Sequence, residues 1–312
     1  MPPPTPDADA ALAQRMGEAN YARRMEKEIA CPRFDPSRQR VSWRYTFKNA
    51  VMRILLKCTG LTRRGERNMA DIRVESNDLH IAGLPSALDG FRLLQLSDLH
   101  FNLAPQLLEK PLKQALSATR CDACVITGDF FEYPPDAAQR DQLLGILHKI
   151  EAPTFGCLGN RDPLELIPAL ETAGVRILLN EAVPIERNGS TIWLVGVDDT
   201  SVRGEPDLSH ATKTVPADAC IILLAHSPDF AETAVHDARI NAMLSGHTHG
   251  GQLCLPGGIP LTINCPCPRE RGSGTWQLGE LQGYTSRGTG SGGVPARLNC
   301  SPEITLHTLR QR

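Results

Sequence analysis

Five short apolar runs, each ending in Asp, Asn or His beside Gly or Ser, constrain the fold of this chain more than any other feature. The runs are FRLLQLSD, CDACVITGD, APTFGCLGN, CIILLAHS and NAMLSGHTH. Runs of this length that are rich in Leu, Ile and Val are typical of buried strands. With helices between such strands, polar groups that follow their carboxyl ends line one edge of the sheets of an α/β protein. We therefore expect the five ends to converge on one site.

The composition is that of a globular protein. The 312 residues are 41% hydrophobic, 22% charged and 5% aromatic, which is enough apolar content to bury a core. The formal net charge is -2, so no global field indicates a protein that coats nucleic acid. Ten cysteines in a chain of this length, without a basic and apolar leader, predict reduced thiols and a cytoplasmic location. No apolar window approaches the length of a transmembrane helix.

The composition divides the chain into an N-terminal extension, residues 1–70, and a catalytic domain, residues 71–312. The first forty or so residues are rich in Pro, Ala and mixed charge, and we expect a mobile or loosely docked segment there. Residues 40–67 are strongly basic and contain a single acid, Glu66. The basic residues are Arg40, Arg44, Lys48, Arg53, Lys57, Arg63, Arg64 and Arg67.

An amphipathic helix is expected over about residues 40–60 of this basic segment. Its apolar residues recur at helical spacing and form one stripe: Trp43, Phe47, Val51, Ile54 and Cys58. Long cationic side chains beside such a stripe suit a helix that lies on an anionic membrane. The alternative is a helix that packs on the catalytic domain and turns its basic face to solvent. The basic excess favours peripheral attachment to the inner face of the cytoplasmic membrane.

The ends of the five runs carry seven oxygen or imidazole donors: Asp98, His100, Asp129, Asn160, His226, His247 and His249. Each donor alone fits a capping or satisfied polar residue, but the ordered set predicts a site. In extended backbone Asp98 and His100 point the same way and can hold one ion, and His247 and His249 repeat the arrangement. Mixed His and carboxylate donors suit Mn, Zn, Fe or Co, and seven donors exceed the needs of one ion. We expect two ions, bridged by Asp129.

The motifs SDLH, TGD, GNRD, AHSP and GHTHGGQ, in this order, resemble those of the calcineurin-like metallophosphoesterases. The resemblance covers about residue 71 to the C-terminus, and the tail YTSRGTGSGGVPARLNCSPEITLHTL is similar to a bacterial branch that includes phosphodiesterases and UDP-2,3-diacylglucosamine pyrophosphatases of lipid A biosynthesis. It implies a four-layer αββα sandwich of two mixed β-sheets flanked by helices, and two divalent ions, Mn first. The implied ligands are Asp98, His100, Asp129 and His249 for one ion, and Asp129, Asn160, His226 and His247 for the other.

The third motif departs from the family pattern, in which most members carry a His after the Asn. This chain has Arg161, followed by Asp162, and we expect both to act in catalysis together with Asn160. A guanidinium binds phosphate oxygens but does not release a proton near neutral pH. The chemistry should therefore favour a leaving group that needs no proton, such as the phosphate monoester released from a phosphoanhydride. The alternative is that Arg161 pairs with an acid while a His elsewhere donates the proton.

These features predict a dinuclear metallohydrolase that acts by direct in-line attack of hydroxide, without a covalent enzyme intermediate. The expected substrate is a nucleotide-linked lipid, UDP-2,3-diacylglucosamine, cleaved to UMP and the lipid monophosphate. The alternatives are a general metallophosphodiesterase and a non-catalytic binding scaffold on the same fold. No nucleic acid partner is expected, because the catalytic region lacks clear basic and aromatic platforms. Arg287 and Ser291, at the Gly-rich GTGSGG segment, are candidates for substrate contact.

Overall fold

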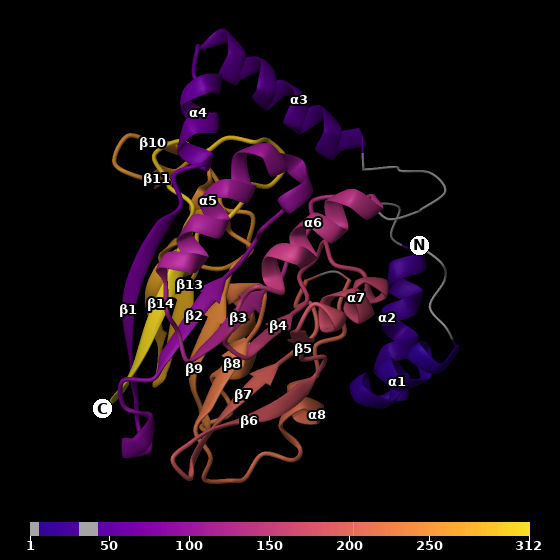
Figure 1. Cartoon of the computed structure of the whole chain (residues 1–312), viewed down its shortest axis with the longest axis vertical. Coiled ribbons are helices and arrows are strands. Elements are labelled where there is room, and N and C mark those ends of the chain that lie inside the picture. The colour runs from indigo at the N-terminus through magenta and orange to yellow at the C-terminus, as the bar shows by residue number, and fades with distance from the viewer. Residues whose placement is uncertain (1–5, 31–42, 202) are drawn as a thin grey trace.

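Two six-stranded sheets packed face to face form the centre of the molecule, and helices cover their outer faces (Figure 1). The computed structural model describes residues 6–30, 43–201 and 203–312. One apolar core lies between the sheets, a second lies between the first sheet and its helices, and a third lies on the outer face of the second sheet. This arrangement confirms the predicted αββα sandwich.

The first sheet contains both the first and the last strand of the sandwich in sequence order. Its strands, in spatial order, are β1 (Arg73–Ile81), β14 (Glu303–Gln311), β2 (Arg92–Leu96), β3 (Ala123–Thr127), β4 (Thr154–Cys157) and β5 (Val175–Ile177). Strands β2 to β5 run parallel, whereas β14 runs antiparallel to β2. The sheet is therefore mixed, as the sequence predicts. Three of the donor-bearing runs form the neighbouring strands β2, β3 and β4, so their carboxyl ends lie side by side.

The second sheet carries the other two donor-bearing runs, as β8 and β9. Its strands, in spatial order, are β12 (Gly274–Leu278), β13 (Leu281–Thr285), β9 (Ile240–Ser245), β8 (Ile221–Leu224), β7 (Ser190–Gly196) and β6 (Glu181–Arg187). It is mixed as well, with antiparallel hairpins at its two edges. Every residue of β3 and β8 is buried, which explains why these runs are continuously apolar rather than alternating. A separate hairpin pairs β10 (Cys254–Leu255) with β11 (Ile259–Pro260).

Short helices and turns complete the outer layers. The helices over the first sheet are α5 (Pro105–Ala118), α6 (Ala137–Leu147) and α7 (Ile167–Thr172), and those at the second are α8 (Leu208–Thr212) and α9 (Ala231–Ala234). The 3-10 turns are η2 (Ser86–Leu88), η3 (Phe101–Leu103), η4 (Leu164–Leu166), η5 (Pro228–Phe230), η6 (His249–Gly251) and η7 (Arg269–Arg271). Turn η6 begins at the donor His249, and η3 begins directly after the donor His100, so these donors lie where strands give way to tight turns.

The first described segment is helical and docked, so the expectation of a mobile or loosely docked segment is wrong for residues 6–30. It forms α1 (Pro6–Met16) and α2 (Glu18–Ala30). Leu12 and Met16 are buried in the core beside the first sheet. Arg24 is completely buried, and its Nε lies 3.1 Å from Oδ2 of Asp198. A buried ion pair anchors this segment. The apolar residues of the segment alone are too few to predict that it docks.

The basic segment forms α3 (Trp43–Cys58) and α4 (Thr62–Met69), whereas Arg40 lies outside the described residues. The expected helix is therefore present. It packs on the sandwich through Met52 and Leu56, which contact a small core around Val294 and Leu298. The face of α3 that packs on the sandwich is not the predicted stripe. The stripe residues Trp43, Phe47, Val51 and Ile54 remain exposed. Among the described helices, none is both long and apolar enough to cross a bilayer.

Candidate metal centre

The structure brings all seven predicted donors together at one end of the two sheets. Each lies one to four residues after the end of β2, β3, β4, β8 or β9. The convergence expected from the five runs is therefore observed. All seven side chains are buried or nearly so, and together they form the donor cluster: Asp98, His100, Asp129, Asn160, His226, His247 and His249.

One half of the donor cluster is formed by Asp98, His100 and His249. The Nε2 atoms of the two histidines lie 3.1 Å apart. Oδ1 of Asp98 lies 3.3 Å from Nε2 of His249 and 3.8 Å from Nε2 of His100. One ligand atom from each residue falls within 4.8 Å of the others, which is compact enough for a single ion.

The other half contains His226, His247 and Asn160. Nδ1 of His247 lies 3.2 Å from Nε2 of His226 and 3.0 Å from Oδ1 of Asn160. Asp129 lies between the halves, because its Oδ2 is 3.4 Å from Nε2 of His100 and 3.5 Å from Nε2 of His226. This position suits the bridging carboxylate predicted from the sequence.

The backbone of the donor loops is left-handed rather than extended, which corrects the expected conformation. Asp98, His100, Asp129, His247 and His249 have φ values of 50°, 40°, 58°, 69° and 54°. His247 and His249 also differ from the expectation, because His249 lies beside Asp98 and His100 whereas His247 lies beside His226 and Asn160. A left-handed non-glycine residue costs about 1 to 3 kcal/mol, so the surrounding structure must hold it in place. Backbone hydrogen bonds do so: the N–H of Asp98 donates to the carbonyl of Gly128 at 2.9 Å, and that of His100 to Asp129 at 3.0 Å.

Two glycines allow the loops after β3 and β4 to approach each other closely. Gly128 has a φ of 87°, and a Cβ at this position would lie 2.5 Å from the backbone nitrogen of Gly159 and 2.8 Å from Nδ1 of His226. A side chain here would therefore separate Asp129 from the loop that carries Asn160.

The donor cluster fits divalent cations. Among the described residues, buried Oδ1 of Asp98 has no hydrogen-bond partner, although imidazole nitrogens face it. Two pairs of imidazole nitrogens lie 3.1 and 3.2 Å apart, close enough for each pair to ligate one ion. Imidazole, carboxylate and amide donors together match the preferences of Mn, Fe, Co and Zn.

Electrostatics within the cluster favours the protonation states that ligands require at Asp98, Asp129, His247 and His249. Despite burial, neighbouring carboxylates raise the pKa of His100 and His226, so an arriving ion must displace a proton from these two rings. Burial alone would raise the pKa of Asp98 and Asp129, but His249 and His226 beside them lower both pKa values well below the usual range. Burial lowers the pKa of His247, and that of His249 to about 3. At neutral pH, both carboxylates are thus ionised and both of these imidazoles are neutral, as metal binding demands.

Glu132 supports the cluster and was not predicted from the sequence. It is fully buried, and its Oε2 lies 2.8 Å from Nδ1 of His100. Burial would lower the pKa of His100, but the Glu132 charge and neighbouring carboxylates raise it to about 10. The contact leaves Nε2 of the ring directed at the cluster, which is the usual role of a carboxylate behind a ligating histidine. An acid after two phenylalanines, in TGDFFE, is the signal that could have revealed it.

Arg161 lies beside the cluster, as predicted, and pairs with Glu132 rather than with Asp162. Its Nη2 is 3.7 Å from Oε1 of Glu132, and its guanidinium carbon lies 4.7 Å from the ring centroid of Tyr45. Its backbone N–H donates to Oδ1 of Asp129 at 2.8 Å. The guanidinium is therefore held between an acid and an aromatic ring at the edge of the site.

Asp162, also predicted to be catalytic, is completely buried behind the cluster. Its carboxylate accepts backbone N–H bonds from Asp129 at 2.7 Å, Phe130 at 3.0 Å and Gly159 at 2.9 Å. Burial and the charge of Asp129 raise its pKa to about 7. These contacts tie the loops after β3 and β4 together, so its place favours positioning of Asp129 over contact with substrate.

The two candidates for substrate contact, Arg287 and Ser291, do not line the cleft above the cluster. Arg287 pairs with Glu75 at 2.6 Å and with Glu303 at 2.5 Å. Ser291 is fully buried, and its hydroxyl accepts a hydrogen bond from Arg297 at 3.3 Å. Both side chains therefore stabilise the loop between β13 and β14.

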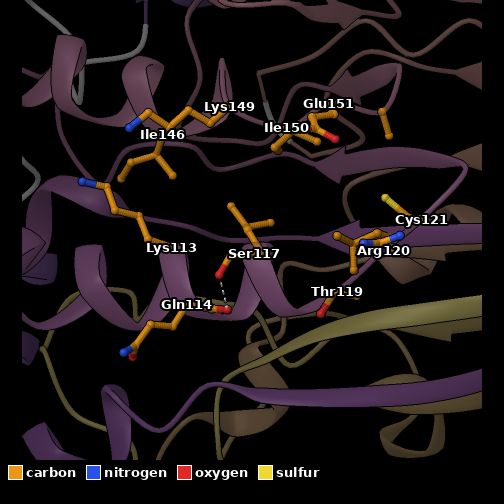
Figure 2. A pocket seen from close by; sticks show the side chains of 13 residues that line it. Lys113, Gln114, Ser117, Thr119, Arg120, Cys121, Ile146, Lys149, Ile150 and Glu151 are labelled. Atoms are coloured by element: carbon orange, nitrogen blue, oxygen red, sulfur yellow. Dashed lines mark hydrogen bonds between the residues drawn. The ribbon is translucent and has the colours of Figure 1, made fainter.

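A cleft of about 220 Å³ opens above the cluster and is walled partly by α3. The helix contributes Tyr45, Lys48, Asn49 and Met52, and residues 251–253 and 261–264 contribute another part of the wall. A larger groove of about 830 Å³ lies at the carboxyl ends of α5 and α6, around Lys113 and Cys121, and contains none of the seven donors (Figure 2). The donor residues, rather than the volume of the cavity, thus identify the candidate site.

Comparisons with known proteins identify the family of this chain. The model of the calcineurin-like phosphoesterase family matches residues 91–251. The uncharacterized metallophosphoesterase YkuE of Bacillus subtilis is 32% identical, over 73% of this chain and 82% of that protein. Phosphodiesterase YaeI of Escherichia coli is 34% identical, over 69% of this chain and 81% of that protein. The structure of the Thermus thermophilus sulfate thiohydrolase SoxB aligns at a TM-score of 0.41 and 12% identity, covering 73% of this chain and 57% of that one. The chain therefore belongs to the calcineurin-like phosphoesterases, hydrolases of phosphoesters that use divalent metal ions.

Proposed function

We propose that this protein hydrolyses a phosphoanhydride, with UDP-2,3-diacylglucosamine as substrate and UMP and the lipid monophosphate as products. The observation that carries the proposal is the position of Arg161, held at the donor cluster, at the place where the family pattern named in the sequence analysis has a histidine. We further propose that residues 71–312 are the catalytic domain and that residues 1–70 are an extension that completes one wall of its cleft.

The donor cluster is proposed to hold two ions, Mn first, with Fe, Zn and Co as alternatives. The first would be held by Asp98, His100, Asp129 and His249, and the second by Asp129, Asn160, His226 and His247. Two divalent ions at such a site supply positive charge to the phosphoryl group and an activated water for in-line attack. Asn160 also lies where its amide can orient a phosphate oxygen.

Arg161 is proposed to bind the phosphate oxygens through its guanidinium. Glu132 and the ring of Tyr45 hold that group in place, so little side-chain entropy is lost when substrate binds. Charge placed in advance where the transition state becomes more negative lowers its free energy. Arg161 therefore stabilises the negative charge of the transition state but donates no proton to the leaving group.

The rest of the cleft supports a leaving group that needs no proton. In the described part of the chain, the only histidines that line the cleft are His100, His247 and His249, which belong to the cluster. The hydroxyl of Tyr45 donates to Glu132, and burial raises the pKa of Tyr45 well above its usual range. A phosphate monoester leaves readily as an anion, whereas an alkoxide does not.

A membrane-bound substrate agrees with the helix beside the cleft. The predicted stripe of α3 is exposed, with Trp43 at 72%, Phe47 at 63% and Ile54 at 60%. Basic residues lie on the same helix and on α4, including Lys57 and Arg63. We propose that this stripe binds anionic lipid on the cytoplasmic side of the membrane, where the acyl chains of the substrate reside.

Hydrolysis of another phosphodiester is the second candidate, favoured by the name of the Escherichia coli relative, phosphodiesterase YaeI. The two candidates differ in the leaving group. Fast hydrolysis of diesters whose leaving group is a poorly stabilised alkoxide would favour the second, because Arg161 offers such a group no proton.

The test is UMP release from UDP-2,3-diacylglucosamine by the Mn-loaded protein in detergent micelles. The wild type should release UMP, and Asp129→Ala should not, because the substitution removes the carboxylate between the two halves of the cluster. Asp141→Ala, at an exposed acid on α6, is the matched control and should keep full activity. Absence of UMP together with brisk hydrolysis of simple diesters would leave the second candidate standing and overturn the first.

A further inference from the structure

Exposed apolar side chains gather around the cleft. Of the ten large hydrophobic residues that are exposed in the described part of the chain, eight belong to α3 and to residues 255–261. We call this set the apolar rim: Trp43, Phe47, Val51, Ile54, Leu55, Leu255, Ile259 and Leu261. The other two, Ile29 and Val74, lie on α2 and β1. Exposed apolar side chains that are concentrated in one region of a protein surface indicate an interaction site.

The apolar rim has two separate parts that border the same cleft. α3 lines the cleft with Tyr45 and Met52, and the segment around β10 and β11 lines it with Leu253 and Leu261. Met52 and Leu253 also pack against the same small core, which joins the two parts. Figure 1 shows α3, β10 and β11 at the same end of the molecule. The two parts therefore lie at one end of the molecule, on elements that border the same cleft.

The charges around the rim select an anionic occupant. Residues 43–67 contain seven basic residues and one acid, Glu66, and residues 250–268 contain no charged residue. A second copy of this chain would bring two basic surfaces against each other, which is unfavourable. Anionic lipid headgroups pair with the cations while the apolar side chains enter the boundary with the acyl chains.

We propose that α3 and the β10–β11 hairpin dock together on an anionic lipid surface, so that the cleft opens directly onto the headgroups. The hairpin is thus a second membrane element, independent in sequence from the basic helix. This inference rests on the proposed function and deepens it, because a lipid-linked phosphate can enter the cleft while its acyl chains stay in the bilayer.

Three matched Ile→Ser substitutions test the proposal by vesicle flotation. Ile259→Ser removes an apolar side chain from the hairpin, Ile54→Ser removes one from α3, and Ile29→Ser removes one from α2, away from the rim. None of these residues lines the cleft, so hydrolysis of a soluble diester should be unchanged in all three and reports correct folding. The probes are vesicles of phosphatidylcholine alone and of phosphatidylcholine mixed with phosphatidylglycerol.

The wild type should float with the anionic vesicles and bind the neutral ones less. Ile259→Ser and Ile54→Ser should each weaken binding about three- to tenfold, and Ile29→Ser should match the wild type. Equal binding by Ile259→Ser and the wild type would overturn the role of the hairpin. A wild type that does not float, or that forms a dimer which Ile54→Ser or Ile259→Ser dissociates in light scattering, would overturn docking on lipid altogether.

The readout separates this inference from the proposed function. Vesicle binding without UMP release would leave the docking surface in place and remove the substrate. UMP release in micelles by a wild type that does not bind vesicles would retain the substrate and remove the docking surface.

Discussion

Tyr45 in α3 donates its hydroxyl to Oε1 of Glu132, in the loop after β3, at 2.5 Å. The other carboxylate oxygen of Glu132 lies 2.8 Å from Nδ1 of His100. A single buried carboxylate therefore connects α3 to the donor cluster. The helix that carries the exposed apolar stripe therefore also supports the site, through Tyr45 on a different face from the stripe.

Replacing Glu132 should weaken ion binding without touching a donor. Glu132→Gln keeps the shape of the side chain but removes the charge facing His100, and we expect affinity for Mn to fall about 10- to 100-fold. Tyr45→Phe should have a smaller effect in the same direction. Titration calorimetry of the ion-free protein measures both, with exposed Glu186→Gln as the control. Equal affinity in Glu132→Gln and the wild type would show that the contact does not position His100.

Arg161→His should change which leaving groups the enzyme accepts. The imidazole can supply a proton, so hydrolysis of diesters with poor leaving groups should rise relative to hydrolysis of phosphoanhydrides. The measurement is kcat/KM for a series of aryl diesters of increasing leaving-group pKa, and the expected result is a shallower dependence in the variant. Arg161→Lys retains the charge without a useful acid and should keep the steep dependence. Parallel lines for all three proteins would contradict the role given to Arg161.

Arg24→Ala should destabilise the protein strongly and release α1 and α2. The substitution leaves Asp198 buried without its ion-pair partner, and breaking such a pair costs about 3 to 5 kcal/mol. Urea unfolding measures the loss. Asp198→Asn in the Arg24→Ala background should restore part of the stability, because it removes the uncompensated charge. An additive double-mutant cycle would indicate that the pair contributes no coupling energy.

His307 should make the fold sensitive to acid. Burial lowers the pKa of His307 to about 3, and its ring nitrogens lie 3.0 Å from the amide of Asn77 and 2.9 Å from that of Gln95. Between pH 6.5 and about 3 the unfolded chain binds a proton at this residue and the folded protein does not. The free energy of unfolding should therefore fall on acidification through this window, by up to about 1.4 kcal/mol per pH unit from this residue.

His307→Gln removes that proton uptake. The difference in unfolding free energy between the wild type and the variant should shrink as the pH is lowered from 7 toward 4, as measured by denaturant unfolding at each pH. A constant difference across this range would show that His307 does not carry the expected dependence.

The strand ends could be predicted because each run is continuously apolar and ends in a polar residue. Burial on both faces of β3 and β8 makes each run continuously apolar. These strands belong to the two different sheets, whose face-to-face packing brings Asp129 and His226 together at one end of the sandwich. The left-handed backbone at Asp98 and His249 could not be predicted, because Asp and His adopt it more often than most residues but still only rarely. It is imposed by the hydrogen bonds between neighbouring loops.

Contacts between segments far apart in the sequence could not be predicted either. The periodicity of α3 revealed the stripe at Trp43 and Phe47 but not the opposite face, where Tyr45 meets Glu132. The docking of α2 depends on Arg24 and Asp198, and a lone arginine in a polar helix is ordinarily a solvated residue. Sequence patterns indicate which residues of one segment are buried. Both of these contacts depend instead on which residues of a distant segment lie opposite in the folded protein.

Five of the seven donors lie on left-handed backbone that the surrounding loops enforce. An arriving ion therefore meets a preorganised cage, and little conformational entropy remains to be lost on binding. A substitution in the strands beneath the cage can weaken its affinity for ions by relaxing those loops, even though every ligand is retained. Metal affinity in this protein is thus a property of the assembled sheets as much as of seven side chains.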